Sequence, residues 1–430
     1  MASTPPSLAA LAPTFSSSID GFAEGYEWAV QRALNWVQSD RPGVLPSYWA
    51  GLTDRPMFYS RDVAHQALGA HFIGLDEENF TMLRHFAASA TPARRYFPLW
   101  SFHFDGRPAR IDYRTDRRFV RETPVVFELV ERSLDMYLWT GDDRYLDDPA
   151  MQAFYENTLT RFTELHDPFG WRIAGASGTR DIFTGTATYN EGPKGPGLRV
   201  AGDGIASQWA ALARAATVFD GSALGLAALR EAEHIQARFE DSWWDSARGH
   251  YATGFTARGA SHEFAFEPSW FPAVKSLMAP DRAQRHLDFV AANLRETPPP
   301  NIEAFTYLPE AFFAYGRDAE AIRWIRHLID SRDDYPEVSF SVIAHLLGGL
   351  TGLRAVAPRV LETRSHLPDG DVEARGVPYR DHRLDIRHEG GTRSTLTVHG
   401  GTAPLVWRAR VAHDVHERIV SPGETASVGT

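Results

Sequence analysis

Glu337 opens an apolar segment, at a position where a carboxylate can do acid–base chemistry. Residues 335–340 read YPEVSF, and the proline favours a helix that starts here. Free backbone N–H groups and the positive end of a helix dipole stabilise an anion in the first turn. The sequence therefore predicts an exposed, ionised carboxylate suited to a general base, with a plain first-turn helix charge as the alternative.

Further carboxylates fall in long links or at the starts of predicted helices. They are Asp62, Glu122, Asp181, Glu191, Asp203, Glu267 and Glu303. Cleavage of a glycosidic bond needs two carboxyl groups on opposite sides of the bond, one to protonate the leaving oxygen and one to activate water or attack directly. Carboxylates supplied to one face by different segments would meet that need.

Glu191 is the expected general acid. It lies in TATYNEGPKGPGLRVAGDG, a segment rich in glycine and proline. Partial desolvation by such a loop would raise its pKa, as an acid working near neutrality requires. Asp181 is the alternative acid, and a solvated loop glutamate is the alternative interpretation of Glu191.

Arg61 and Asp62 stand where a loop enters a predicted helix, in SRDVAHQ. The aspartate can accept hydrogen bonds from sugar hydroxyls and the arginine can donate to another sugar oxygen, although a helix cap explains the pair about as well. The other residues expected to contact a substrate are Tyr59, His65, Glu122, Tyr189, Trp270 and Glu303.

The sequence indicates neither a metal nor a cofactor. His65 and His71 are six residues apart on one predicted helix, a spacing that does not direct both rings to one ion. The chain has no cysteine, so thiolate chemistry and disulfides are excluded. It also has no nucleotide-binding fingerprint and no GxSxG motif.

Composition points to a folded globular protein. The 430 residues are 43% hydrophobic, with 26 Phe, 14 Tyr and 12 Trp, an aromatic supply that suits a core and also a sugar-stacking pocket. A formal charge of −11 disfavours nucleic acid as a partner. No segment has the composition of a membrane span or of a secretory signal, so we expect a cytoplasmic protein without a membrane partner.

Twelve helices are expected to position these residues. Periodicity and capping residues place them near 20–38, 62–74, 76–89, 123–141, 148–166, 203–218, 221–244 and 268–278, and then from about 280, 302, 318 and 335. Links that follow an even-numbered helix are short, whereas three of those that precede one have about 20 to 36 residues. In an alternating antiparallel arrangement the long links share one face, which is where function usually resides.

The predicted fold class is all-α, six helical hairpins with a small β-rich appendage. Residues 1–18 are expected to be disordered, 19–354 to form the helical domain, 355–415 to form the appendage and 416–430 to be a frayed tail. The appendage is predicted from alternating runs such as HRLDIRH and STLTVHG between glycine pairs.

From about residue 20 to 352 the chain resembles the six-hairpin, (α/α)6-barrel glycosidases, the superfamily of glucoamylase-like and maltose-phosphorylase-like enzymes. The resemblance implies that Arg61 and Asp62 bind the terminal sugar, that Glu191 or Asp181 is the acid between helices five and six, and that Glu337 is the base. The chain departs from the pattern in lacking a large N-terminal β-sandwich and in its YNEGP acid segment. The segment from Leu367 to Trp407 also resembles the end of uncharacterised bacterial proteins of this kind.

The expected function is an exo-acting, inverting hydrolysis of an oligosaccharide or glycoside. A uronate-type polysaccharide lyase is an alternative, because the loop 91–121 contains His103, Tyr113, Arg117, Arg118 and Arg121. A sugar 2-epimerase on the same barrel would need paired histidines on the loop face, and a non-catalytic carbohydrate-binding protein would need no carboxylate pair. The sequence leaves the sugar and the oligomeric state open.

Overall fold

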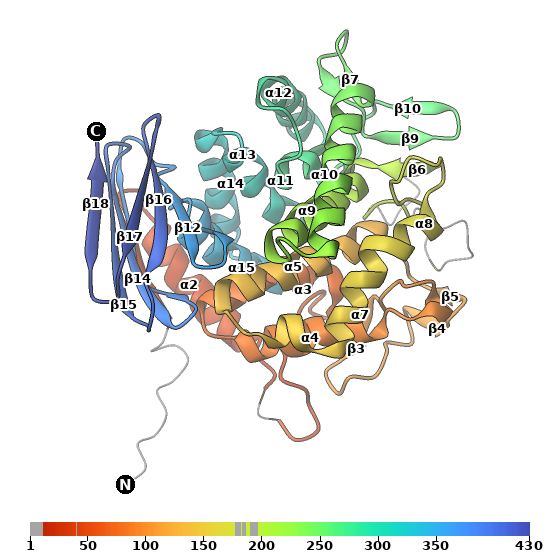
Figure 1. Ribbon diagram of the computed structural model, residues 1–430, viewed down its shortest axis with the longest axis horizontal. Coiled ribbons are helices and arrows are strands. Elements are labelled where there is room, and N and C mark those ends of the chain that lie inside the picture. Colours follow the sequence, from red (N-terminus) through yellow and green to blue (C-terminus); the bar gives the residue numbers. More distant parts are fainter. Residues whose placement is uncertain (1–11, 40, 177–181, 183–185, 190–196) are drawn as a thin grey trace.

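Six inner helices form a closed ring. The computed structural model describes residues 12–39, 41–176, 182, 186–189 and 197–430 (Figure 1). They are α3 (Ser60–Phe72), α5 (Thr123–Thr140), α9 (Gly202–Val218), α11 (Glu267–Val274), α13 (Leu308–Phe313) and α15 (Pro336–Ala344). From α3 to α13 each inner helix packs against the next one, and α15 packs against α3. The 3-10 turn η3 (Glu303–Tyr307) and the π-turn η4 (His345–Gly349) complete the contact between α13 and α15.

Six outer helices each precede an inner one along the chain. They are α2 (Phe22–Asn35), α4 (Asp76–Ser89), α7 (Pro149–Asn157), α10 (Ala223–Ser242), α12 (Pro280–Glu296) and α14 (Asp318–Ser331). Outer helices bury one stripe only, as Leu287, Val290 and Leu294 show on α12, whereas every residue of α15 is buried. Each of the twelve helices predicted from the sequence has a counterpart here.

Local sequence explains where these helices start and end. Pro124 lies in the first turn of α5, and Gly141 ends the helix with a φ of 68°, a conformation that glycine adopts without steric cost. The fifth predicted helix is interrupted: α7 continues as the π-turn η2 (Thr158–Phe162) and then α8 (Thr163–His166).

The links that lead into the inner helices pair with one another. The strand β2 (Met57–Tyr59), before α3, pairs with β3 (Ser101–His103), in the link before α5. The strand β6 (Leu198–Ala201), before α9, pairs with β9 (Gly254–Thr256), in the link before α11. These pairings place four long links at the end of the ring where the inner helices begin.

Short elements complete the links among the described residues. They are η1 (Pro92–Arg94), β4 (Tyr113–Thr115), β5 (Arg118–Phe119), α6 (Arg144–Asp147), β7 (Trp244–Asp245), β8 (His250–Tyr251) and β10 (Gly259–Ser261). No described helix combines the length and the apolar character that crossing a membrane requires.

Two sheets stand beside the helical ring (Figure 1). The five-stranded sheet has the order β1-β13-β14-β15-β18 and the four-stranded sheet the order β11-β12-β16-β17, with β12 and β16 parallel. Their bounds are β1 (Thr14–Ser17), β11 (Arg354–Ala357), β12 (Val360–Arg364), β13 (Asp371–Tyr379), β14 (His382–Glu389), β15 (Arg393–Gly400), β16 (Leu405–Val411), β17 (Asp414–Val420) and β18 (Thr425–Gly429).

The all-α class predicted from the sequence is wrong, because the described residues combine the helical ring with six sheets. Strand β1 lies inside the segment 1–18, where disorder was expected, and is held by antiparallel pairing to β13. Strands β17 and β18 occupy most of 416–430, where a frayed tail was expected. Short and polar edge strands carry little alternation, so their pairing depends on neighbours distant in sequence.

Candidate active site

An acidic residue stands at or just before the start of each inner helix. In chain order these residues are Asp62, Glu122, Asp203, Glu267, Glu303 and Glu337. The positive end of a helix dipole and its free N–H groups favour carboxylates at such positions. The ring therefore gathers acidic side chains at the end where its long links lie.

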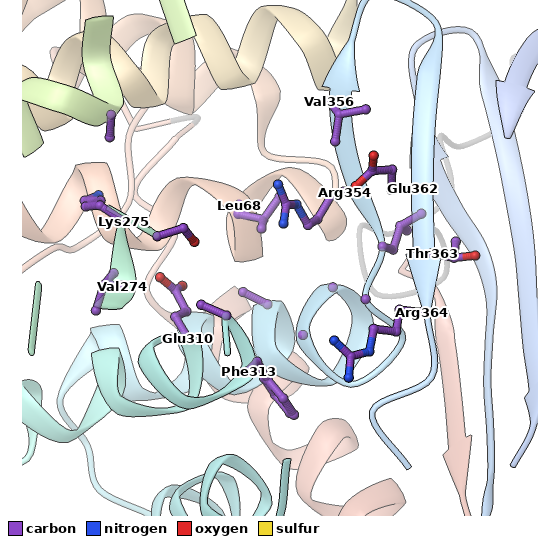
Figure 2. Close-up of a pocket in the computed structure, with 18 of the residues that line it drawn as sticks. Leu68, Val274, Lys275, Glu310, Phe313, Arg354, Val356, Glu362, Thr363 and Arg364 are labelled. Atoms are coloured by element: carbon purple, nitrogen blue, oxygen red, sulfur yellow. The ribbon is translucent and has the colours of Figure 1, made fainter. Parts of the chain in front are cut away.

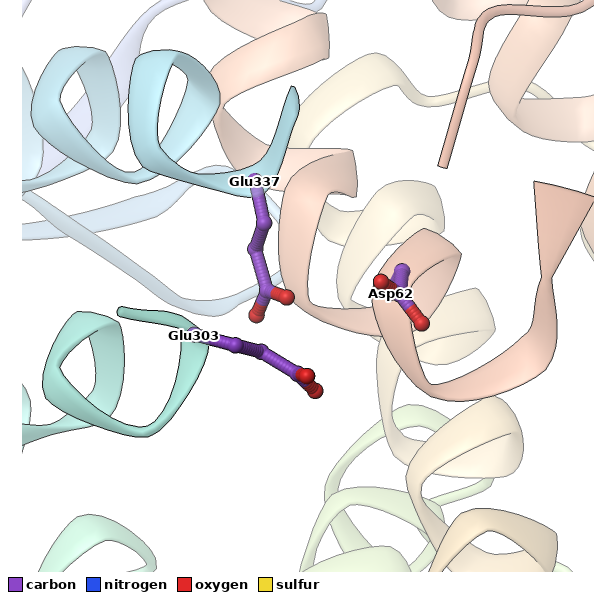
Figure 3. Close-up of side chains that lie close together, drawn as sticks. All are labelled: Asp62, Glu303 and Glu337. Atoms are coloured by element: carbon purple, nitrogen blue, oxygen red, sulfur yellow. The ribbon is translucent and has the colours of Figure 1, made fainter. Parts of the chain in front are cut away.

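Three of these carboxylates lie close together (Figure 3). One oxygen from each of Asp62, Glu303 and Glu337 lies within 4.8 Å of the other two, and all three residues are buried. They come from three different elements, α3, η3 and α15. Segments more than 270 residues apart in the chain thus form one cluster.

Glu337 is fully buried, in contrast to the exposed position that the sequence predicted. Its Oε1 contacts His65 Nδ1 and accepts a hydrogen bond from Thr306 Oγ1 at 3.3 Å. Its Oε2 has no hydrogen-bond partner in the described part of the chain. Burial raises the pKa of the Glu337 carboxyl, and the neighbouring His65 acts in the opposite direction.

His65 lies between two carboxylates. Its Nε2 is 3.6 Å from Glu310 Oε1, and its ring stacks on Tyr307 with centroids 3.8 Å apart. Burial alone would lower the pKa of His65, but Glu337 and Glu310 raise it to about 9. The same contact lowers the pKa of the half-buried Glu310 to about 2. At neutral pH His65 is therefore a cation held by Glu337 on one side and Glu310 on the other.

Arg61, Asp62 and Glu303 share partners on the other side of the cluster. The Tyr335 hydroxyl lies 2.7 Å from Asp62 Oδ1 and 3.3 Å from Glu303 Oε2. Arg61 forms an ion pair with Glu303 and lies over the Tyr189 ring at 5.1 Å. Burial, followed by the charges of Glu303 and Glu337, raises the pKa of Asp62.

The central carboxylates are also the group of described residues whose spacing could hold a cation. Arg61 pairs with Glu303 and His65 pairs with Glu337, so two protein cations already offset most of the negative charge. A hard cation would have to displace these contacts to reach the carboxylate oxygens. The geometry therefore favours a protein-balanced cluster.

Tyr59 and Glu122 lie together beside Trp100. The Trp100 indole N–H donates to Glu122 Oε2 at 2.7 Å, and the Tyr59 ring packs edge-on against the same indole at 5.0 Å. Tyr189 is buried, with its hydroxyl bonded to Glu128 and its backbone N–H donating to Asp203 at 2.8 Å.

Trp270, expected to contact a substrate, is fully buried. Its ring packs against Phe264 and Phe266 with centroids 6.0 Å apart in each case. This tryptophan therefore has no free face for a sugar ring. Of the expected contact residues, the structure brings Arg61, Asp62, His65 and Glu303 to Glu337.

Glu191 and Asp181 lie outside the described residues, so the position of the expected acid is not part of this geometry. Glu267, a candidate from the initial set of carboxylates, shows a pKa raised to about 7 by burial, with Arg61 opposing. Asp203 also has a pKa raised to about 7 by burial, but it accepts hydrogen bonds from Thr188 Oγ1 and two backbone N–H groups. These bonds tie Thr188 and Tyr189 to the start of α9.

Sequence reasoning missed Glu310, Tyr335 and Tyr307. Glu310 interrupts the apolar run LPEAFF of α13, and an acid inside a buried helix is a signal that a partner must be close. The sequence identifies Tyr335 as the residue before Pro336, but the contacts of its hydroxyl group depend on tertiary structure.

Two of the residues proposed for a lyase make contacts within their own loop. Tyr113 donates to Asp116 at 2.9 Å and Arg121 stacks on Phe119 at 4.0 Å. The β4–β5 hairpin that carries Arg118 lies at the periphery of the molecule (Figure 1).

The chain shares its fold with solved glycosidases and a phosphorylase, which agrees with the resemblance drawn from the sequence. A GH78 rhamnosidase of Bacillus sp. GL1 aligns over 90% of this chain with a TM-score of 0.60 and 14% identity. A putative kojibiose phosphorylase from the human microbiome aligns over 98% of this chain and 68% of its own, with a TM-score of 0.59 and 8% identity. A glycosidase variant in complex with glucose aligns over 77% of this chain and 99% of its own, with a TM-score of 0.54 and 12% identity.

This chain spans only 41% of the length of that GH78 rhamnosidase. No protein-family model and no curated protein matches its sequence. At these identities the likeness is one of fold.

Proposed function

We propose that the protein is a glycoside hydrolase in which Glu337 is the general base. The observation that carries the proposal is the state of this carboxylate: Oε1 is fixed by His65 and Thr306, while Oε2 is buried without a partner among the described residues. A buried acceptor left open in this way is suited to bind and deprotonate one water molecule. The cationic His65 favours the ionised form that a base needs.

Glu191 is the proposed general acid, from its place in the link between the fifth and sixth predicted helices. It would protonate the leaving oxygen while Glu337 activates water on the opposite face of the sugar. This is single displacement with inversion, for which the two carboxyl groups are expected about 6.5 to 9.5 Å apart. Asp181 and Glu267 are the alternative acids, the latter because of its raised pKa.

Arg61 and Asp62 are proposed to hold the terminal sugar, making the enzyme exo-acting. Both stand at the start of α3, one turn or less from His65, which contacts Glu337. Asp62 can accept from a sugar hydroxyl, and Tyr335 fixes the orientation of its carboxylate. A monosaccharide unit bound here would place its anomeric carbon near the proposed base.

A neutral sugar is the expected substrate. Arg61 and His65 balance two of the three buried carboxylates, so one negative charge is left over. That charge disfavours a uronate or any other anionic ring, which argues against the lyase alternative. The same repulsion disfavours phosphate as the attacking group, although one structural neighbour is titled a phosphorylase. Other neighbours are titled as complexes with glucose and with rhamnose, so glucosides and rhamnosides are the first substrates to test.

The test is a panel of aryl glycosides and disaccharides incubated with the wild-type protein and with Glu337→Gln, with and without inorganic phosphate. We expect release of a free sugar by the wild type only, and proton NMR before mutarotation should show the inverted anomer. A product with a new conjugated double bond, a sugar 1-phosphate, or full activity of Glu337→Gln would each contradict the proposal.

A further inference from the structure

A cavity of about 640 Å³ lies between the later parts of the inner helices and the four-stranded sheet (Figure 2). Its helical wall comes from the later parts of the inner helices, including Leu68 of α3, Trp209 of α9 and Lys275 just after α11. Its other wall is the four-stranded sheet, through β11, β12 and β16. The three carboxylates of the cluster do not line this space, although Glu310, which contacts His65, does.

The sheet wall of the cavity is strongly basic. The side chains that line it alternate along three neighbouring strands, as expected for one face of a sheet: Arg354 and Val356 on β11, Glu362 and Arg364 on β12, and Arg408 and Arg410 on β16. In the strand register Arg354 is opposite Glu362, Glu362 is beside Arg408, and Arg364 is beside Arg410. One sheet face thus presents four arginines and one glutamate.

Most cations around the cavity already have a partner. Lys275 Nζ lies 2.5 Å from Glu128 and 2.7 Å from Glu131. Arg408 pairs with Glu417 at 2.8 Å, whereas Arg364 reaches Asp318 only at 4.0 Å. A separate pair of helix cations shares one acid: Arg132 and Arg214 both bind Asp135.

Arg354 and Arg410 are different. Neither guanidinium makes an ion pair or a hydrogen bond with any residue that the structure describes, and both line the cavity. Figure 2 shows Arg354 extending into the open space toward Leu68. Both side chains are exposed to solvent, and Arg354 experiences the positive charges of Arg214 and Arg410 as well as the negative charges of Glu362 and Asp135. Positive charge is therefore in excess at this wall.

We propose that this cavity is a binding site for an organic phosphate of mono- to disaccharide size. Two free guanidinium groups can each donate paired hydrogen bonds to phosphate oxygens, the geometry at which arginine excels. A phosphate group would offset the excess of positive charge at this wall. Inorganic phosphate alone would leave most of the cavity empty, since volumes of about 300–1,000 Å³ suit drug-sized ligands.

The remaining lining suits the sugar part of such a ligand. Glu131, Glu362 and Thr217 offer acceptors for hydroxyl groups, and Trp209 offers an aromatic surface. The polar groups come from the helices as well as from the sheet. A ligand that bridges both walls would tie the four-stranded sheet to the helical ring.

The experiment is isothermal titration of the full chain with glucose 6-phosphate at constant ionic strength. We expect saturable binding to the wild type, weakened roughly tenfold or more by Arg354→Ala and by Arg410→Ala, because each loses a charge-assisted contact. Arg258→Ala is the matched control, since Arg258 is exposed on the β9–β10 turn and should leave binding unchanged. Glu337→Gln should also leave binding unchanged, which separates this site from the active site.

Several outcomes would overturn the proposal. These are no binding of glucose 6-phosphate, equal binding of glucose, equal binding of inorganic phosphate, or binding that survives both arginine substitutions. Loss of binding in Glu337→Gln would place the ligand at the other end of the ring and would also overturn it. Circular dichroism and urea unfolding check that both arginine variants fold, which we expect because neither side chain loses a partner among the described residues.

Discussion

The two ends of the inner-helix ring differ in the sign of their charge. At the end where the helices begin, Asp62, Glu303 and Glu337 meet within 4.8 Å. At the end where they finish, Arg354 and Arg410 face a cavity without a described partner. Helix dipoles favour anions at the first end and cations at the second. The two proposed sites therefore call for opposite ligand chemistries, acid–base work on a neutral sugar at the first end and binding of an anion at the second.

Glu310 and His65 connect these two ends. Glu310 lines the cavity and also contacts His65, whose other nitrogen contacts Glu337. The charges of these three residues alternate; His65 and Glu337 are buried and Glu310 is half-buried. Removing single members shows whether the two ends act separately or together.

The largest effect is expected at the carboxylate end. Glu337→Gln keeps the shape of the side chain but cannot accept a proton, so kcat should fall by about 10²- to 10⁴-fold. The loss should be similar for aryl glycosides and for disaccharides, because water activation does not depend on the leaving group. Initial rates of sugar release measure it. A loss confined to substrates with poor leaving groups would instead assign Glu337 as the acid.

At the opposite end the expected loss is one of stability. Lys275→Met removes the cation that Glu128 and Glu131 share, which leaves buried carboxylates uncompensated at a cost of about 3–5 kcal/mol in the free energy of unfolding. Urea unfolding at pH 7 measures the change. Arg258→Met, on the exposed turn, is the control and should change stability by less than about 0.5 kcal/mol. A Lys275→Met protein as stable as the control would contradict the buried ion-pair network.

Asp62→Asn should have a smaller effect on catalysis than the loss of the base. The amide keeps one acceptor for the Tyr335 hydroxyl but loses the charge that binds a sugar hydroxyl. We expect KM to rise and kcat to fall, with kcat/KM reduced roughly 10- to 100-fold, about 1.4–2.8 kcal/mol of transition-state binding. Steady-state kinetics on the best substrate measure KM and kcat. If both are unchanged in Asp62→Asn, Asp62 is a helix-end residue without a role in substrate binding.

The helices and the acidic ends could be predicted from the sequence because their signals are local. Pro124 and Gly141 bound α5, and Pro336 places Glu337 in a first turn, without reference to the rest of the chain. Strand β17, DVHERIV, lacks a regular apolar alternation and most of its residues are exposed. Such a strand exists because it pairs with β16, and pairing between segments is not written in either one alone.

The site was predictable in part for the same reason. Arg61, Asp62, Glu303 and Glu337 stand at helix starts, which brings them to one end of the ring once the hairpins form. Trp270 could not be separated from a sugar-stacking residue, because core and pocket aromatics have the same local sequence. The placement of Glu310 beneath His65 depends on the tertiary packing of α13 against the rest of the ring.

The pH dependence of the stability of Glu310→Gln tests the connection between the two ends of the ring. The pKa of His65 is raised to about 9 in the folded protein, from about 6.5 in an unfolded chain. The stabilisation from its charged contacts is therefore complete below about pH 6.5 and is lost as the pH rises toward 9. The variant removes one of the two carboxylates that raise this pKa, so its stability should fall less over that interval, by roughly 1–2 kcal/mol.

Urea unfolding of the wild type and of Glu310→Gln between pH 6.5 and 9 measures the difference. Glu362→Gln is the matched control, because Glu362 lines the same cavity and makes no described contact with a histidine. At low pH the wild type should also lose stability, as the pH falls from about 4.5 toward 2, because the pKa of Glu310 is lowered to about 2. The Glu310→Gln variant should lose less stability over this interval. Identical pH profiles for the wild type and Glu310→Gln would mean that His65 is held by Glu337 alone and that the two ends of the ring are electrostatically independent.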